Sequence, residues 1–305
     1  MFKYGITLFT LMKVGVVGLG RMGGAFARNL LRRGYELYVY DIVKSKVEDF
    51  IKLGAKGVSS PAEMASIVDV LLTNVPKSED MLSVYLDENG ILRAPRPGLI
   101  AIETTTTDIP SKLKLAEECN RKGVGFLVAM LGLTVPQAER GETPLFIGGP
   151  KELLGNSNVQ RVLTDLSSGR IYYMGRIETA VAFKLITNTM GFAQLLVFLE
   201  GLQFITKFGM SAEDFLKAAK DTAAYNYWFD ARHEKILKED YSAYFPIDFI
   251  IKDLMYTLES AKNINCPLPM ASLAVQFYIM ASGKGYGNED GIALMKILRE
   301  YCKGR

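Results

Sequence analysis

The chain has 305 residues, 49% of them hydrophobic and 23% charged, which is typical of a globular protein long enough for two domains. A formal net charge of +3 is too small to indicate nucleic acid or an anionic membrane as a partner. Cys119, Cys266 and Cys302 are widely spaced and form no CxxC pair, which excludes the usual zinc motifs and a disulfide framework. This cysteine usage favours a reducing, cytoplasmic compartment.

Residues 1–11 are predicted to be an N-terminal extension that precedes the first domain. Their apolar run is interrupted by Gly5, Thr7 and Thr10, and no small-residue cleavage site follows, so the segment does not match a signal peptide.

From Lys13 to about Tyr173, short β-branched runs alternate with amphipathic helices, a pattern typical of parallel βαβ units. Ser60 followed by Pro61 predicts the start of one of these helices. The expected strands are 14–17, 36–40, 70–74, 99–102, 126–129, 145–147 and 171–173. Residues 12–174 are therefore expected to form a doubly wound α/β domain.

After Gly175 the pattern becomes helical throughout. The expected helices are 178–207, 211–222, 231–238, 246–263, 269–282 and 289–302. Residues 175–305 are therefore expected to form an all-helical domain for substrate binding and oligomerisation. The most apolar stretch, 190–199, is too short to span a bilayer and is flanked by Lys184 and Glu200, so a buried helix is favoured over a membrane span.

A glycine-rich turn follows the first expected strand and opens a helix, which is the setting of a Rossmann dinucleotide site. Gly18 permits the tight turn, Gly20 lets the backbone approach a pyrophosphate, and Gly23 allows close packing of helix on strand. Leu19, Arg21 and Met22 complete the turn. The alternative is a glycine-rich turn that binds no ligand.

Asp41 ends the second expected strand, 18 residues after Gly23. A carboxylate at this place accepts hydrogen bonds from the adenosine ribose hydroxyls and repels a 2′-phosphate, which favours NAD as the cofactor. Lys44 and Lys46 could still attract a phosphate, so NADP is the less favoured alternative.

Together these and later motifs make the chain similar to the β-hydroxyacid dehydrogenase family, typified by 3-hydroxyisobutyrate dehydrogenase and related to 6-phosphogluconate dehydrogenase. The resemblance extends over nearly the whole chain after Met12. The motifs that carry it are Gly18–Gly23 with Asn29-Leu30 and Gly34, Asn74-Val75-Pro76, Glu103-Thr104-Thr105-Thr106, Gly175 with Lys184-Leu185-Ile186-Thr187-Asn188, Lys252-Asp253-Leu254 with Pro267 and Pro269, and Gly287 with Asp290.

The resemblance implies an NAD-dependent dehydrogenase in which Lys184 is the general acid/base and Asn188 assists it. The residues support this independently, because an ammonium among the apolar residues 181–183 and 185–186 is costly to bury and its proton-accepting form is favoured. Asn188 lies one helical turn beyond Lys184 on the same face. The alternative is a lysine that reaches from an apolar helix to solvent.

The resemblance also implies further contacts with the cofactor. They are assigned to Asn74, Val75, Pro76, Thr105, Thr106 and Lys252. As bare sequence, the threonines could simply end a strand, and Lys252 with Asp253 could be a charged pair on a solvated face.

The segment that matches the family's substrate-binding segment is altered in this chain. In the family a serine hydroxyl and glycine amides bind the substrate carboxylate, whereas this chain has Gly132, Leu133 and Thr134. Losing such hydrogen bonds to a charged ligand costs about 1.5–3 kcal/mol each. The expected substrate is therefore a small hydroxy acid, an aldehyde or a related carbonyl compound that is bulkier or less charged than 3-hydroxyisobutyrate, with Lys184 and Asn188 also in contact.

Two other functions stay open at this stage. One is a decarboxylating sugar-acid dehydrogenase, although the helical half has few phosphate- or polyol-binding residues. The other is an NAD-binding sensor or regulatory protein that has lost catalysis. The aromatic stretch 225–229 and the long apolar helix also predict a homodimer or homotetramer, since a small helical domain buries so much apolar surface with difficulty.

Overall fold

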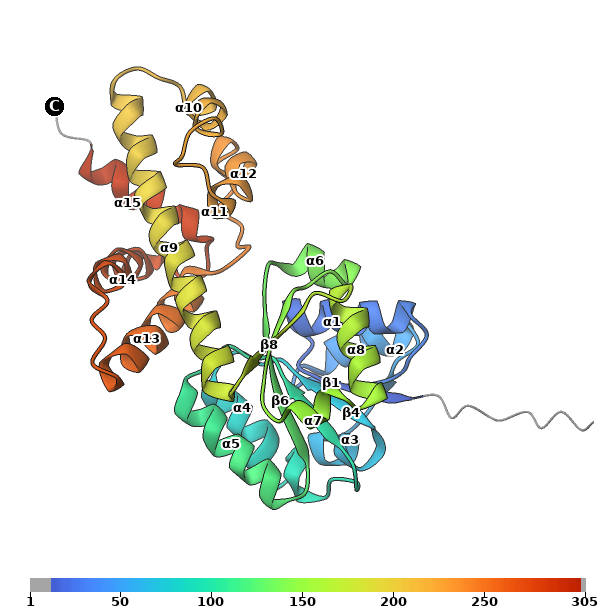
Figure 1. The fold of residues 1–305 in the computed structure, drawn as a ribbon. Coiled ribbons are helices and arrows are strands. Elements are labelled where there is room, and N and C mark those ends of the chain that lie inside the picture. The colour runs from blue at the N-terminus through green and yellow to red at the C-terminus, as the bar shows by residue number, and fades with distance from the viewer. Residues whose placement is uncertain (1–11, 303–305) are drawn as a thin grey trace, which may run out of the picture. The chain divides into compact units, whose positions relative to one another are not determined.

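The computed structural model describes residues 12–302, so the predicted N-terminal extension 1–11 lies outside the described residues. The chain divides into two compact units, Met1–Lys184 and Leu185–Arg305. The predicted division was at residue 175, whereas this division falls inside α9 (Ile177–Lys207), which is one unbroken helix (Figure 1).

The first unit is built on an eight-stranded sheet with the strand order β3-β2-β1-β4-β5-β6-β7-β8 (Figure 1). The strands are β1 (Lys13–Val17), β2 (Glu36–Tyr40), β3 (Lys56–Gly57), β4 (Val70–Thr73), β5 (Ile100–Glu103), β6 (Gly125–Leu131), β7 (Leu145–Gly148) and β8 (Ile171–Gly175). Neighbouring strands are parallel except for β6 and β7, which are antiparallel. The predicted doubly wound α/β sheet is confirmed.

Two details of this sheet differ from the sequence-based prediction. β3 was not expected, because its two residues are too few to show a pattern, and it pairs with β2 at the sheet edge. β7 returns along β6 instead of running parallel to it, and the hydrogen bond from Gly132 N to Pro144 O continues the β6–β7 ladder at 2.9 Å.

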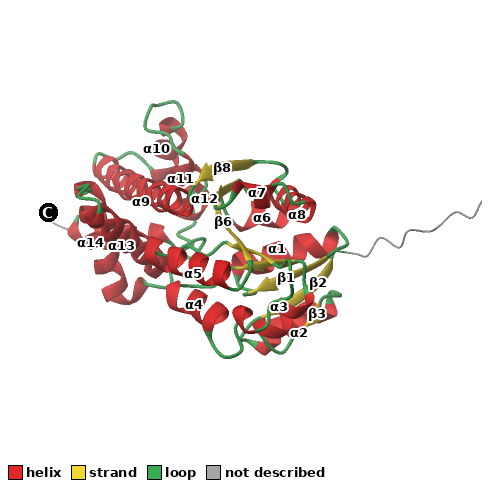
Figure 2. Ribbon diagram, turned by 60° about the horizontal axis from the view of Figure 1, so that its bottom comes forward, coloured by secondary structure: helices red, strands yellow, loops and turns green. Residues whose placement is uncertain are grey.

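Helices cover both faces of the sheet (Figure 2). They are α1 (Arg21–Arg32), α2 (Lys44–Lys52), α3 (Pro61–Ile67), α4 (Ser78–Leu86), η1 (Ile91–Arg93), α5 (Ile109–Arg121), α6 (Val135–Arg140), α7 (Lys151–Leu154) and α8 (Ser157–Ser167). Phe26 and Leu30 of α1 and Phe50 of α2 join the strands in one core on one face. On the other face, α3 lies so close to β1 that a Cβ atom on Gly15 would be 2.5 Å from the sulfur of Met64.

Local sequence fixes where two of these helices begin. The Ser60 hydroxyl accepts the N–H of Glu63 at 3.1 Å, and Pro61 occupies the first turn of α3, as the sequence predicted. The Asp108 carboxylate accepts the N–H of Ser111 at 2.7 Å and caps α5, which follows the predicted threonine segment.

In the second unit, the described residues from Leu185 to Cys302 form helices and connecting loops. After α9 come α10 (Ala212–Ala219), α11 (Tyr227–Asp230), α12 (His233–Leu237), α13 (Ile247–Asn263), α14 (Pro269–Ala281), η2 (Ser282–Tyr286), η3 (Gly291–Ala293) and α15 (Leu294–Tyr301). Their core contains Phe192, Phe198, Phe229 and Tyr278. The predicted all-helical domain is confirmed.

Asp290 explains why the predicted helix 289–302 begins later than expected. Its buried carboxylate accepts the backbone N–H groups of Tyr244 and Phe245 at 2.8 and 3.0 Å and the Nε–H of Arg232 at 2.8 Å. It also caps η3 by accepting the N–H of Ile292 at 3.3 Å. The aspartate of the late glycine–aspartate motif is thus accounted for by hydrogen bonds within this unit.

α9 is long and apolar enough, by length and composition alone, to cross a membrane. The sequence-based argument considered residues 190–199 alone and was too narrow, because an 18-residue window of this 31-residue helix is apolar enough. Half of its most apolar window is buried inside the protein, and core helices of proteins that do not span membranes meet the same criteria. The helix is weak evidence for a membrane.

Candidate functional site

The predicted glycine turn lies at the carboxyl end of β1, and its geometry explains the spacing of its glycines. Gly18 adopts φ +90°, and a Cβ atom there would lie 2.1 Å from the carbonyl oxygen of Asn74. A Cβ atom on Gly23 would lie 1.9 Å from the carbonyl oxygen of Gly18. Gly20, in contrast, is exposed and has nothing within 4 Å of its Cβ position. The turn therefore closes tightly on the protein side and leaves an open backbone, at the N-terminus of α1, for an anionic ligand.

The side chains between these glycines face different surroundings. Leu19 is buried, Met22 packs partly buried against the core of the first unit, and Arg21 is exposed. Of the three, only Arg21 therefore offers a charged side chain to a ligand at the open side of the turn.

Asp41, predicted to select the cofactor, lies just after β2 and is bound to the glycine turn. Its Oδ2 accepts the N–H of Leu19 at 2.7 Å, and its Oδ1 accepts the N–H of Val43 at 2.8 Å. The Lys46 ammonium lies 3.7 Å from Oδ2. The carboxylate thus lies beside the turn, with the Lys46 ammonium close to it.

The residues after β4 and β5 are hydrogen-bonded to one another and close to the glycine turn. The Asn74 amide donates to Thr104 Oγ1 at 2.9 Å, and the N–H of Val75 donates to Thr105 Oγ1 at 3.1 Å. Because Gly18 lies directly against Asn74, the predicted cofactor residues of β1, β4 and β5 meet at one edge of the sheet. Of the other two predicted residues of this group, Pro76 is exposed and Thr106 is half-buried.

A buried ion pair that the sequence analysis did not predict supports this edge. Lys112 of α5 pairs with Glu103 at the end of β5, and neither side chain is exposed to solvent. Glu103 also accepts the N–H of Thr105 at 3.0 Å and the hydroxyl of Thr73 at 3.2 Å. The Tyr85 hydroxyl lies 3.0 Å from Thr73 Oγ1, and burial raises the pKa of this phenol well above its ordinary value. The pair therefore anchors the backbone that carries the predicted threonine contacts.

Lys184, the predicted acid/base, lies on α9 and is half-buried. Its Nζ donates to the carbonyl oxygen of Leu131 at 2.7 Å. Leu131 ends β6 and directly precedes the predicted substrate segment 132–134. The structure thus brings the catalytic candidate and the start of this segment together within the first unit.

The substrate segment itself offers little side-chain polarity. A Cβ atom on Gly132 would lie 3.2 Å from the Phe146 ring and 3.3 Å from Pro144, so these side chains limit the room for a larger residue. Leu133 is exposed and has φ +61°. The Thr134 hydroxyl donates to Gln137 Oε1 at 2.8 Å as part of a capping box at the start of α6. This hydroxyl is therefore engaged in holding the helix.

Packing explains Asn29, one of the matched residues, together with Gly141 at the end of α6. The Asn29 amide of α1 donates to the carbonyl oxygen of Asp165 at 3.3 Å. It lies so close to α6 that a Cβ atom on Gly141, which has φ +73°, would be 2.4 Å from its nitrogen. The glycine therefore permits α6 to lie against α1.

The second unit contains Asn188 and Lys252. The Asn188 amide donates to Asp253 Oδ2 at 2.8 Å, and both residues are buried. The Lys252 ammonium lies 3.1 Å from Asp253 Oδ1 and over the ring of Tyr256, 5.2 Å from its centroid. Asp253 thus holds both predicted site residues of this unit. Along α9, Asn188 is one helical turn beyond Lys184.

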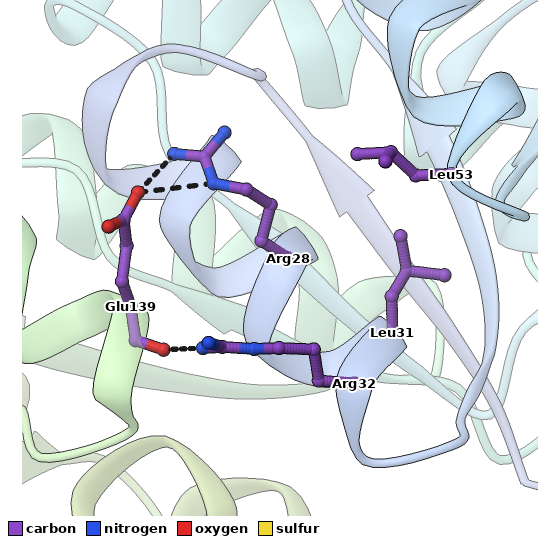
Figure 3. A pocket seen from close by; sticks show the side chains of 5 residues that line it. All are labelled: Arg28, Leu31, Arg32, Leu53 and Glu139. Carbon is purple, nitrogen blue, oxygen red and sulfur yellow. Dashed lines mark hydrogen bonds and ion pairs between the residues drawn. The ribbon is translucent and has the colours of Figure 1, made fainter.

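Two surface pockets contain none of the predicted site residues. Figure 3 shows one of about 430 Å³ in the first unit, where Arg28 and Arg32 of α1 both reach Glu139 of α6 while Leu31 and Leu53 form the apolar side. The other, of about 470 Å³ in the second unit, is lined by Lys220, Asp230, Ala231, His233, Glu234, Lys235 and Tyr244. Within residues 12–302, no group of three histidine, cysteine or acidic residues is arranged to hold a metal ion.

Two family models match the chain. Residues 13–175 match the NAD binding domain of 6-phosphogluconate dehydrogenase. Residues 179–298 match the NAD-binding domain of NADP-dependent 3-hydroxyisobutyrate dehydrogenase. The first match alone covers more than half of the chain.

Relatives that cover nearly the whole chain are dehydrogenases of different hydroxy acids. An L-threonate dehydrogenase of Cupriavidus necator is 29% identical over 93% of this chain and 95% of its own length. A 2-(hydroxymethyl)glutarate dehydrogenase of Eubacterium barkeri is 27% identical over 94% of both chains. The crystal structure of a 3-hydroxyisobutyrate dehydrogenase from Salmonella typhimurium is 25% identical, with a TM-score of 0.85 over 94% of this chain and 99% of that one.

Proposed function

Because the chain belongs to the β-hydroxyacid dehydrogenase family of NAD(P)-dependent oxidoreductases acting on CH–OH groups, we propose that it transfers a hydride between NAD and a small hydroxy acid or the related carbonyl compound. One observation carries the proposal: the Nζ of Lys184 is held by the carbonyl of Leu131, at the start of the segment assigned to the substrate. A proton-transferring group and a substrate segment therefore lie side by side.

The cofactor would be held by the glycine turn and by the edge formed after β4 and β5. The open backbone at Gly20 and the N-terminus of α1 suit a pyrophosphate, and Asp41 suits ribose hydroxyls better than a 2′-phosphate. When bound, the nicotinamide supplies the hydride-accepting or hydride-donating centre. NAD is therefore the proposed cofactor and NADP the less favoured one.

Lys184 is proposed to move the hydroxyl proton. In the oxidation direction its neutral amine takes the O–H proton while the hydride leaves the same carbon, so the alcohol becomes a carbonyl group. The hydrogen bond that Nζ donates to Leu131 O fixes the position of the amine. Asn188 is proposed to assist the reacting oxygen from the next turn of α9, and its amide orientation is fixed by Asp253.

The test is the replacement Lys184→Ala, with Lys207→Ala at the exposed end of the same helix as a matched control. Loss of a positioned acid/base costs on the order of 10²–10⁴-fold in turnover. We expect a decrease in kcat of this size for K184A, unchanged NAD affinity, and normal kinetics for K207A. Normal turnover by K184A would contradict the mechanism. Tight NAD binding by the unmodified protein without any NAD-linked turnover would instead favour a non-catalytic NAD sensor.

A homodimer or homotetramer is also proposed. The sequence argument used the aromatic stretch 225–229 and the long apolar helix, and part of that stretch is buried in the structure. Trp228 and Phe229 of the aromatic stretch pack within the second unit, where Phe229 stacks on Phe198. Tyr225 and Tyr227 of that stretch are exposed, and the more exposed apolar residues lie on α9 and just after its end, where Met190, Val197, Phe204 and Phe208 are each more than half exposed. The first three recur at intervals of seven residues and Phe208 follows one turn later, so they form one stripe, which suits a second copy of the same helix.

The three thiols support a reducing, cytoplasmic location, which we likewise propose. All three cysteines lie in the described part of the chain as free thiols, and Cys266 is exposed. An exposed free thiol persists best where the redox potential keeps thiols reduced.

A further inference from the structure

Leu133 has a backbone conformation that leucine rarely adopts. Its φ of +61° places it in the left-handed region, where the Cβ atom crowds the following carbonyl oxygen. The other described non-glycine residues with positive φ are Ser168, Glu239 and Asn265. Leu133 is therefore the apolar member of this group. An observed backbone outlier of this kind points to a functional constraint when the surrounding structure enforces it.

The residues on both sides enforce this conformation. Before it, Gly132 continues the β6–β7 ladder by donating to Pro144 O at 2.9 Å. After it, Thr134 is fixed by its backbone and hydroxyl hydrogen bonds to Gln137 at 3.3 and 2.8 Å. The turn between these two fixed points presents the Leu133 side chain outward, with 39% of the residue exposed. The strained leucine is thus kept at the surface, where it adds little to the core.

Leu133 lies close along the chain to the carbonyl group that binds the proposed catalytic lysine. Lys184 donates to Leu131 O, two residues before Leu133. Aromatic rings border the segment as well, because the Phe146 ring lies 3.2 Å from the Cβ position of Gly132 and its centroid is 4.6 Å from that of the Phe183 ring. With the Thr134 hydroxyl engaged by Gln137, the segment offers a substrate apolar contact more than side-chain hydrogen bonds.

We propose that Leu133 determines substrate specificity by contacting an apolar substituent, branched aliphatic or aromatic, on the carbon next to the reacting carbinol. This inference rests on the proposed function, since Lys184 marks where the reacting carbon lies. The preferred substrates are then hydroxy acids that carry a substituent larger than methyl at that carbon.

The test compares 3-hydroxy-2-methylpropanoate with 3-hydroxy-2-(2-methylpropyl)propanoate, which differ only in that substituent. Initial rates with NAD give kcat/KM for the unmodified enzyme and for Leu133→Ala and Leu133→Gly. Leu113→Ala in α5 is the matched control, because Leu113 is also 39% exposed. Thermal unfolding checks that each variant folds; the glycine variant should keep its melting temperature, since glycine adopts positive φ readily.

We expect the unmodified enzyme to prefer the larger substrate by about tenfold or more, as a few buried methyl groups of a substrate achieve in an apolar pocket. L133A and L133G should lose most of this preference through a higher KM for the larger substrate, and L113A should keep it. An equal or opposite preference in the unmodified enzyme, or a preference unchanged in L133A and L133G, overturns the inference and leaves the proposed function intact. If K184A turns over both substrates normally, the proposed function fails and the inference fails with it.

Discussion

The carboxylate of Asp41 accepts the backbone N–H of Leu19 at 2.7 Å, so the end of β2 holds the glycine turn that follows β1. A hydrogen bond to a charged acceptor contributes about 1.5–3 kcal/mol, more than one between neutral groups. The same side chain that is proposed to meet the cofactor ribose therefore also fixes the turn proposed to meet the pyrophosphate. Cofactor choice and the geometry of the turn are coupled through one residue.

Asp41→Asn is predicted to weaken the discrimination between NAD and NADP. The amide oxygen can still accept the Leu19 N–H, but the charge that repels a 2′-phosphate is gone and the Lys46 ammonium is no longer offset. We expect kcat/KM for NAD over NADP to be tenfold or more in the unmodified enzyme and to fall at least tenfold in D41N. Steady-state kinetics with both cofactors measures this.

Asp49→Asn is the matched control for this prediction, because Asp49 lies on α2, is exposed, and pairs with Lys52. It changes the net charge by the same amount without touching the glycine turn. Equal use of NAD and NADP by the unmodified enzyme would show that Asp41 does not select the cofactor.

Lys112→Met is predicted to destabilise the first unit strongly. It leaves the Glu103 carboxylate buried without its cation, and breaking a buried ion pair by removing one partner costs about 3–5 kcal/mol. The double variant Lys112→Met with Glu103→Gln should recover much of this loss, since glutamine is uncharged and can still accept the Thr105 N–H. Urea unfolding of the three proteins measures the free energies.

Lys114→Met, two residues along α5 and exposed, is the control and should change stability by less than about 0.5 kcal/mol. A K112M variant as stable as K114M would mean that Glu103 does not need its cation. The role assigned to the pair at this sheet edge would then be untenable.

The buried pair also shows where sequence-based prediction stops. Lys112, Leu115 and Cys119 recur at helical spacing on the buried face of α5, so a signal for the buried lysine was present. Its partner Glu103, however, is identified only when β5 and α5 are placed against each other. Strand patterns likewise predicted seven of the eight strands, but not that β7 runs antiparallel to β6, because periodicity carries no direction.

In the candidate site, too, features that depend on local sequence could be predicted, and features that depend on tertiary contacts could not. The roles of Gly18 and Gly23 could be predicted from their spacing. A Cβ atom at either position would clash with a nearby backbone carbonyl oxygen, that of Asn74 or of Gly18. The left-handed Leu133 could not be predicted, since an apolar residue gives no sign of positive φ and the constraint comes from the bonds of its neighbours to Pro144 and Gln137.

Stability is predicted to fall in alkaline solution partly through Cys119. Burial raises the pKa of this thiol to about 12 from its ordinary value of 9.0. Well below pH 9 the thiol is protonated in both the folded and the unfolded chain. Between about pH 9 and 12 the unfolded chain loses the proton first, so the free energy of unfolding falls by up to about 1.4 kcal/mol per pH unit.

Urea unfolding at pH 8 to 11 should therefore give a shallower pH dependence for Cys119→Ala than for the unmodified protein. The slopes are compared, because the alanine also removes packing around the sulfur. At pH 8 a thiol reagent should modify the exposed Cys266 and spare Cys119 until the protein unfolds. Rapid modification of Cys119 in the folded protein would contradict its burial.

The stripe on α9 is predicted to be the contact between copies of the chain. Phe204→Glu replaces one of the four exposed apolar side chains of the stripe with a charged one. Burying that charge in a helix–helix contact would be costly without a partner of opposite charge. We expect the unmodified protein to have two or four times the mass of one chain by light scattering, and F204E to have a smaller mass with unchanged helical content. Glu213→Lys, exposed on α10 and outside the stripe, is the control and should keep the larger assembly. A monomeric unmodified protein would show that no such contact forms. An F204E variant that assembles normally would show that the contact lies elsewhere. The stripe would then be an exposed apolar surface of the second unit only.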